Sequence, residues 1–218
     1  MSSDSSRASG FEGVVSAVDR LPLAPAVIGG IGTFASGYVL FVALLTASGN
    51  PNFSTPVRTL KQLGNLFYNA QNVPLVRHRE IVVGDQTINQ EATINLIQLS
   101  EPSLPKVVYY LVPVIVLAIA AALLATRYLE IEDPLETGIA VVGGLTLGYV
   151  LAALVGTYLF AQRTSLDGAS ETLSPEMLMA LGYGVAYPLV IGTLVVGLVV
   201  GWSRLKGSGA ARPSPDQA

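Results

Sequence analysis

The chain has 218 residues, of which 51% are hydrophobic and only 12% charged, and its formal net charge is −3. Soluble domains carry about 25% charged residues, so this composition argues against a soluble globular enzyme and favours a membrane-embedded chain. The acidic balance argues against a nucleic-acid partner. The lack of cysteine excludes disulfides and thiolate chemistry, and the single histidine, His78, excludes a histidine-rich metal site.

Residues 1–22 precede the first apolar stretch and contain a short helical pattern. Phe11, Val14, Val15 and Val18 recur at the spacing of one helix face. This pattern is compatible with an amphipathic helix on the membrane surface and also with a frayed tail. The residues that follow the last apolar stretch, 204–218, are rich in Gly, Ser and Pro and are expected to be disordered.

Four stretches are long enough to cross a bilayer as helices, which takes about 20 mostly apolar residues. They cover residues 23–47, 107–126, 138–161 and 177–203, and none contains Asp, Glu, Lys, Arg or His. A buried core helix explains one such stretch but not four in one chain. The first is too long for the apolar part of a signal peptide, so we expect a retained anchor. The fold class predicted is an all-α membrane protein with four transmembrane helices.

Residues 48–106 form the largest part outside the four stretches. Thr55-Pro56 is a typical helix start, and the residues after it separate an apolar face from a polar face. The apolar face holds Val57, Leu60, Leu63, Gly64 and Phe67; the polar face holds Arg58, Lys61, Gln62, Asn65 and Asn69. Residues 81–83 and 86–88 then predict a small β-hairpin around Gly84-Asp85, with a third extended run over 93–99. Such a hairpin is marginal alone, so it should pack on the other loop, the membrane or a partner.

The shorter connections carry helix-start signals. In the acidic loop 127–137, Asp133-Pro134 with Glu136 predicts a capped start for the third span, and we interpret this cluster as a helix start rather than a metal site. In the loop 162–176, Ser174-Pro175-Glu176 repeats that pattern.

Two short motifs lie in the first loop. Arg77-His78-Arg79 is either an anion contact or a solvated turn before a strand, and we favour the turn. Asn52 begins a sequence that matches a glycosylation acceptor.

Small residues recur every fourth position in two of the spans. The third span carries Gly144, Gly148, Ala152 and Gly156, and the fourth carries Thr193, Gly197 and Gly201. Small residues at this spacing let helix backbones approach closely in a membrane. We therefore predict helix packing through these positions, with the third and fourth spans in tight contact.

Prolines interrupt two spans, at Pro113 and Pro188. Pro188 removes the backbone hydrogen bond to Gly184, beside which Tyr183 and Tyr187 share a helix face. One interpretation is a broken helix that lines a transport site. The other is a tolerated kink, which we favour because no ionisable residue accompanies the break.

No enzyme signature is present. The chain lacks a nucleophile–histidine–acid set, an HExxH sequence, a P-loop and paired carboxylates within a span. We therefore expect no catalytic residue, no bound metal and no cofactor.

An even number of spans places both termini on one side of the membrane. Lys and Arg divide equally between the two sides, but Arg77 and Arg79 lie far inside a long loop and count little. We expect a multi-pass protein of the cell membrane with cytoplasmic termini, and an outside first loop agrees with the Asn52 sequence.

Several segments resemble a family of uncharacterised four-span membrane proteins of halophilic archaea. They are Gly64-Asn65-Leu66-Phe67-Tyr68-Asn69-Ala70, Tyr110-Leu111-Val112-Pro113, Gly148-Tyr149 and Tyr187-Pro188. Asn65 and Gln71 stand where related sequences often carry Trp and His. The resemblance implies a four-span fold that is at most loosely transporter-like, and no established activity.

Two functions follow as hypotheses. The first is a structural or accessory subunit, or a scaffold, with the lipid bilayer and a homo- or hetero-oligomer as partners. The alternative is a transporter or channel component with a site near the Gly184–Pro188 break.

Overall fold

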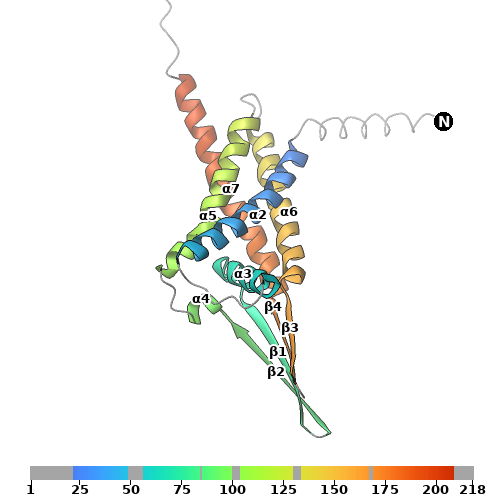
Figure 1. Cartoon of the computed structure of the whole chain (residues 1–218). Helices are drawn as coiled ribbons and strands as arrows, with labels where there is room; N and C mark the ends of the chain where they lie inside the picture. The colour runs from blue at the N-terminus through green and yellow to red at the C-terminus, as the bar shows by residue number, and fades with distance from the viewer. Residues whose placement is uncertain are drawn as a thin grey trace, which may run out of the picture.

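The computed structural model describes residues 22–48, 56–83, 85–99, 104–129, 134–166 and 169–208. Four long helices form a bundle, and a small sheet projects from one end of it (Figure 1). The first and last described residues lie at the opposite end of the bundle from the sheet (Figure 1). The predicted surface helix before residue 22, the Asn52 sequence and the tail after residue 208 lie outside the described residues.

The four bundle helices are α2 (Leu23–Ala47), α5 (Lys106–Tyr128), α6 (Pro134–Leu159) and α7 (Met177–Ser208). Each is long and apolar enough to cross a membrane, with the candidate span in α7 reaching Leu205. This confirms the prediction of four membrane-capable helices. The helices differ from the predicted stretches by a few residues at several ends, and α7 remains helical past residue 203, where a tail was expected.

α6 is the central helix of the bundle. It packs most extensively against α2 and next against α7, and α5 fills the space between α2 and α7. More than half of the candidate span in α6 is buried within the bundle, compared with about a quarter in the other three (56% against 28%, 28% and 22%). The outward faces of α2, α5 and α7 are lined with exposed Ile, Leu and Val, as expected of surfaces that meet lipid.

The connections at one end of the bundle fold together. α3 (Pro56–Ala70) lies across the end of the helices, and β1 (Leu75–Val83), β2 (Gln86–Ile94) and the short α4 (Leu96–Leu99) follow it (Figure 1). β3 (Gln162–Leu166) and β4 (Ala169–Pro175) come from the connection between α6 and α7. The strands form one antiparallel sheet in the order β2-β1-β4-β3.

This sheet corrects the all-α prediction in three respects. The hairpin predicted at 81–83 and 86–88 is present, but its strands are nine residues long. Its strand β1 also pairs with β4 of a second hairpin, which lies in the 162–176 region that was predicted only as a loop. Residues 93–99 are not a third strand, because Asn95 Oδ1 accepts hydrogen bonds from the backbone of Ile97 and Gln98 and starts α4. Ser174 belongs to β4, opposite Val76, so it does not cap α7.

Glu176 caps α7 in place of Ser174. Its two carboxylate oxygens accept hydrogen bonds from the backbone N–H groups of Leu178 (3.1 Å) and Met179 (2.8 Å). Its own N–H donates to the carbonyl of Pro74 at 2.9 Å. The start of α7 is thereby attached to the segment that joins α3 to β1.

Candidate functional site

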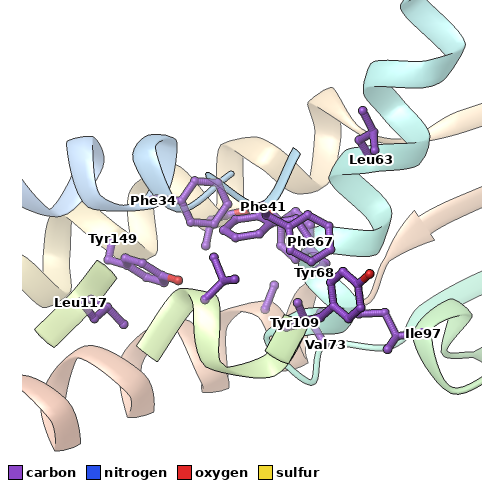
Figure 2. Packing of buried hydrophobic residues seen from close by; sticks show 14 of the residues in the cluster. Phe34, Phe41, Leu63, Phe67, Tyr68, Val73, Ile97, Tyr109, Leu117 and Tyr149 are labelled. Atoms are coloured by element: carbon purple, nitrogen blue, oxygen red, sulfur yellow. Dashed lines mark hydrogen bonds between the residues drawn. The ribbon is translucent and has the colours of Figure 1, made fainter. Parts of the chain in front are cut away.

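The connection between α2 and α5, called the loop below, meets the bundle through an aromatic cluster. Phe34 of α2 lies 5.3 Å from both Phe67 of α3 and Tyr149 of α6, measured between ring centroids. Phe41 of α2 extends the cluster to Tyr109 of α5 at 5.9 Å (Figure 2). These contacts join α3 to three of the four long helices. Edge-to-face aromatic pairs contribute about 0.5–1.5 kcal/mol each beyond the area they bury.

Hydrogen bonds between polar side chains and the bundle hold the same interface. The Tyr149 hydroxyl donates to Gln71 Oε1 at 2.8 Å, and Asn72 Nδ2 donates to the Tyr187 hydroxyl at 2.8 Å. The Tyr68 hydroxyl donates to the carbonyl of Ala153, and Lys61 Nζ donates to that of Ala161 at 2.8 Å. Polar groups of α6 and α7, up to ten residues inside the helix ends at Leu159 and Met177, are therefore used to hold the loop.

Burial keeps the Tyr68 phenol in its neutral form. This side chain is fully buried, and desolvation raises its pKa above the ordinary value of tyrosine. The neutral phenol is the form that donates to Ala153, so the attachment persists to more alkaline pH than the ordinary tyrosine pKa would allow.

Asn69 connects three segments of the loop from inside. Its Nδ2 donates to the carbonyl of Val73 at 2.8 Å, and its Oδ1 accepts from the N–H of Leu96 at 2.7 Å. Asn69 is fully buried, although the sequence had placed it on the polar face of α3. The end of α3, the turn before β1 and the start of α4 are thereby fixed to one another.

Among the amide side chains of the loop that are almost fully buried, Asn65 and Gln71 retain atoms without a protein partner. Asn65 is 0% exposed and neither its Nδ2 nor its Oδ1 makes a hydrogen bond, and Gln71 Nε2 is also unpaired. Buried amide atoms normally have partners, either in the protein or in ordered water. Sequence analysis missed Asn65, Asn69 and Gln71 as interior residues, because helical spacing alone placed the first two opposite the apolar face.

The predicted break in α7 does not open into a cavity. Gly184 and Pro188 are buried within one continuous helix, and a Cβ on Gly184 would meet Val150 and Ala153 of α6 at ordinary contact distances of 3.6–3.7 Å. Pro113 is likewise buried inside α5. The break therefore packs directly against α6.

Tyr183 and Tyr187 lie on the face of α7 that contacts the connection between α2 and α5. Their ring centroids are 6.0 Å apart, and Tyr187 is the residue that Asn72 contacts. Asn72 has a left-handed backbone with φ of 59°, which asparagine tolerates better than most residues. Tyr183 lines a cleft of about 430 Å³ with Asn72, Thr93, Asn95 and other residues of the loop and α7, namely Pro74, Ile94, Gln98 and Met179.

The small-residue positions fall into two groups. A Cβ on Gly148 would overlap the carbonyl of Val27 in α2, and one on Gly144 would lie 2.6 Å from the Cβ of Ala26. Gly30 of α2 approaches the backbone of Tyr149 equally closely. This stripe of α6 therefore faces α2, whereas the sequence suggested α7. Ala152 is partly buried, and Gly156 lies against Tyr68 of α3.

Gly197 and Gly201 of α7 differ from the close-packed glycines of α6. A Cβ on Gly197 or Gly201 would have no atom within 4 Å, and both positions are exposed. With Thr193, Gly197 lines an open apolar groove of about 450 Å³ between α6 and α7. Within the described part of the chain, these two glycines make no close helix contact.

The cationic cluster of the first loop lies in the middle of β1 rather than in a turn. Arg77 Nε lies 3.2 Å from a carboxylate oxygen of Glu171 in β4. His78 Nδ1 lies 3.5 Å from Glu91 of β2. The solvated-turn interpretation is therefore corrected, because acidic residues on both neighbouring strands lie against these side chains. Among the described residues, no group of three or more His, Asp or Glu is arranged to hold a metal.

Comparison with curated proteins and with solved structures found no match. A family model described as a family of unknown function (DUF7978) matches residues 7–204, which include α2, α5, α6, the sheet and α7 as far as Arg204. The chain belongs to this family of unknown function, DUF7978.

Proposed function

We propose that this protein is a multi-pass membrane protein that acts as an accessory subunit or scaffold, with the bundle as its anchor and the projecting sheet as its docking element. The observation that supports this most strongly is the attachment of the loop. Phenols of α6 and α7 bind Gln71 and Asn72, so polar groups inside these two helices fix the loop in place. A fixed loop holds the sheet in a constant orientation relative to the membrane.

The charge distribution supports the same proposal. In the candidate spans, the only described charged residues lie within a few residues of a helix end, as with Glu136 and Arg204. Carriers coupled to protons or ions usually retain an ionisable group at membrane depth. We propose no catalytic role, since the sequence carries no nucleophile–histidine–acid set and no other enzyme signature.

A transporter or channel component is the second candidate. The cleft of about 430 Å³ beside Tyr183 favours it, because the cleft is polar and lies near the Gly184–Pro188 segment. The close packing of Gly184 on Val150 and Ala153 argues against continuation of this cleft into the bundle.

Replacement of Pro188 by alanine separates the two functions. The change restores a backbone hydrogen bond within α7. We expect the variant to be neutral or mildly more stable, with unchanged assembly, because the restored hydrogen bond is offset by the greater freedom of the unfolded chain without proline. Thermal unfolding in detergent and solute flux in reconstituted vesicles measure the two properties. Flux in the wild type that Pro188→Ala eliminates, without loss of folded protein, would establish a carrier instead.

We also propose that the protein lies in the cell membrane with cytoplasmic termini, and that its source is a halophilic archaeon. The chain has no native cysteine, so single cysteines report the orientation without background. Cysteine in place of Asp85 should react with an impermeant thiol reagent on intact cells, and cysteine in place of Glu136 should not. The opposite labelling pattern would invert the orientation.

A further inference from the structure

β2 is an edge strand whose outer side lacks the usual protection. Among the described strands it pairs with β1 alone, and its residues 86–93 are exposed. Its nine residues include one charged residue, Glu91, and no lysine or proline. Natural proteins usually shield such edges with lysine, proline, bulges or short strands, because unpaired backbone groups attract another strand.

The pairing with β1 identifies which backbone groups of β2 point outward. The hairpin closes on the pair Val83 and Gln86, with two residues between them. In a hairpin of this length the closing pair is hydrogen-bonded, and hydrogen-bonded pairs then alternate along the ladder. The outward N–H and C=O groups therefore belong to Thr87, Asn89, Glu91 and Thr93.

We propose that β2 pairs antiparallel with β2 of a second copy of this chain, with the two-fold axis at Gln90. In this register Thr87 lies opposite Thr93 of the second copy, and Asn89 lies opposite Glu91. All four outward residues of each strand then form backbone hydrogen bonds. The result is a continuous eight-stranded sheet with an isologous interface.

The side chains favour a second copy as the occupant. The register places each Glu91 opposite an amide, whereas a shift of the two-fold axis to position 91 would place two carboxylates opposite each other. A shift to position 89 would leave outward groups unpaired. On the other face of the sheet, Ile88 meets Ala92 of the second copy, and the two Gln90 side chains are neighbours.

The symmetry also determines where the second bundle lies. The two-fold axis is perpendicular to the sheet, so the second copy points in the opposite direction along the strands. The sheet projects away from its own bundle, with the tip of the β1–β2 hairpin farthest from it (Figure 1). The two bundles therefore lie at opposite ends of the joined sheet, and the dimer connects two facing bilayers rather than two neighbours in one bilayer.

This inference deepens the proposed docking role by naming the partner, and cysteine crosslinking tests it. Ile88→Cys and Ala92→Cys proteins are reconstituted in separate phosphatidylcholine vesicles, mixed and oxidised. Opposite residues of a non-hydrogen-bonded pair approach closely enough for a disulfide. We expect disulfide-linked dimers from the mixture and none from Ile88→Cys alone. Adding Asn89→Pro to both proteins should lower the yield at least about tenfold, because it removes an outward N–H and leaves the bonds to β1 intact.

Each alternative result overturns a definite part of the inference. If no disulfide forms in the vesicles or in a detergent mixture of the two folded variants, self-pairing of β2 is wrong. If disulfides form only when both variants share one vesicle, the facing-bilayer arrangement is wrong. If Asn89→Pro leaves the yield unchanged, the contact is not made through the β2 edge. Failure of the docking role itself would be detected in a different experiment, as solute flux in reconstituted vesicles that Pro188→Ala eliminates.

Discussion

Replacing Gly148 with leucine is expected to abolish or severely weaken the folded bundle. A side chain at this position would overlap the backbone of Val27 and lie against the N–H of Ile31, and backbone atoms cannot move aside as a flexible side chain does. Overpacking in a well-packed interior costs about 1–3 kcal/mol, and we expect a loss of at least about 3 kcal/mol because α2 must separate from α6. Thermal unfolding in detergent, followed by circular dichroism, measures the loss.

Gly197→Leu is the matched control, because it makes the same substitution in a bundle helix. A Cβ at Gly197 has no atom within 4 Å, so the fold should change by less than about 1 kcal/mol. Trimming the exposed Leu147 next to Gly148 to alanine should be similarly mild. Equal stability of Gly148→Leu and Gly197→Leu would contradict the close α2–α6 contact.

Replacing Asn69 with alanine is expected to release the loop from the end of the bundle. The change leaves the carbonyl of Val73 and the N–H of Leu96 without their partner in a buried site. Each unsatisfied buried group costs about 1–3 kcal/mol, so we expect a loss of about 3 kcal/mol that is concentrated in the loop. Hydrogen exchange should show faster exchange at Leu96 and in α4, with little change in α6.

Asn89→Ala is the control for this prediction, because Asn89 is an exposed asparagine on β2. We expect Asn89→Ala to leave the unfolding of the chain and the exchange at Leu96 and in α4 unchanged, because it retains the backbone N–H assigned to the β2 edge. If Asn69→Ala unfolded no more readily than Asn89→Ala, the interior role of Asn69 would be wrong.

The four long helices could be predicted from the sequence because length and lack of charge are sufficient for a bilayer-spanning helix. Their packing partners could not be predicted. The spacing of Gly144 and Gly148 indicates that another helix approaches α6 closely, but it does not identify that helix. In the structure it is α2, whose Gly30 lies against the backbone of α6. A single glycine on the partner helix is too weak a signal to identify it.

The sheet was only partly predictable. The β1–β2 hairpin has a two-residue turn between two segments rich in Val, Ile and Thr. The second hairpin is short and polar. The sequence feature that could have predicted the second hairpin is Asp167-Gly168, which lies between Thr164 and Thr172. This dipeptide favours a tight hairpin turn. The pairing of β1 with β4 joins residues that are about a hundred positions apart, and local patterns carry no information on it.

The attachment site was the least predictable part. Asn65 and Asn69 fall on the polar side of α3 by spacing, and polar residues are expected to face water. They are buried because α3 is enclosed by the bundle on one side and by α4 and the strands on the other. Tyr187 was singled out as a helix-break residue, but its partner Asn72 lies in a different segment of the chain and could be identified only in three dimensions.

A photocrosslinking scan in native membranes tests the central claim most directly, namely that the sheet is the docking element and the bundle is its anchor. A photoreactive amino acid replaces Asn89 or Thr164 on the two edge strands, or the exposed Leu147 or Leu194 on the bundle. The account predicts discrete protein adducts from the edge positions, including one at the mass of a dimer from Asn89, and only lipid adducts from the bundle positions. Protein adducts from Leu147 or Leu194 with none from the sheet would contradict it.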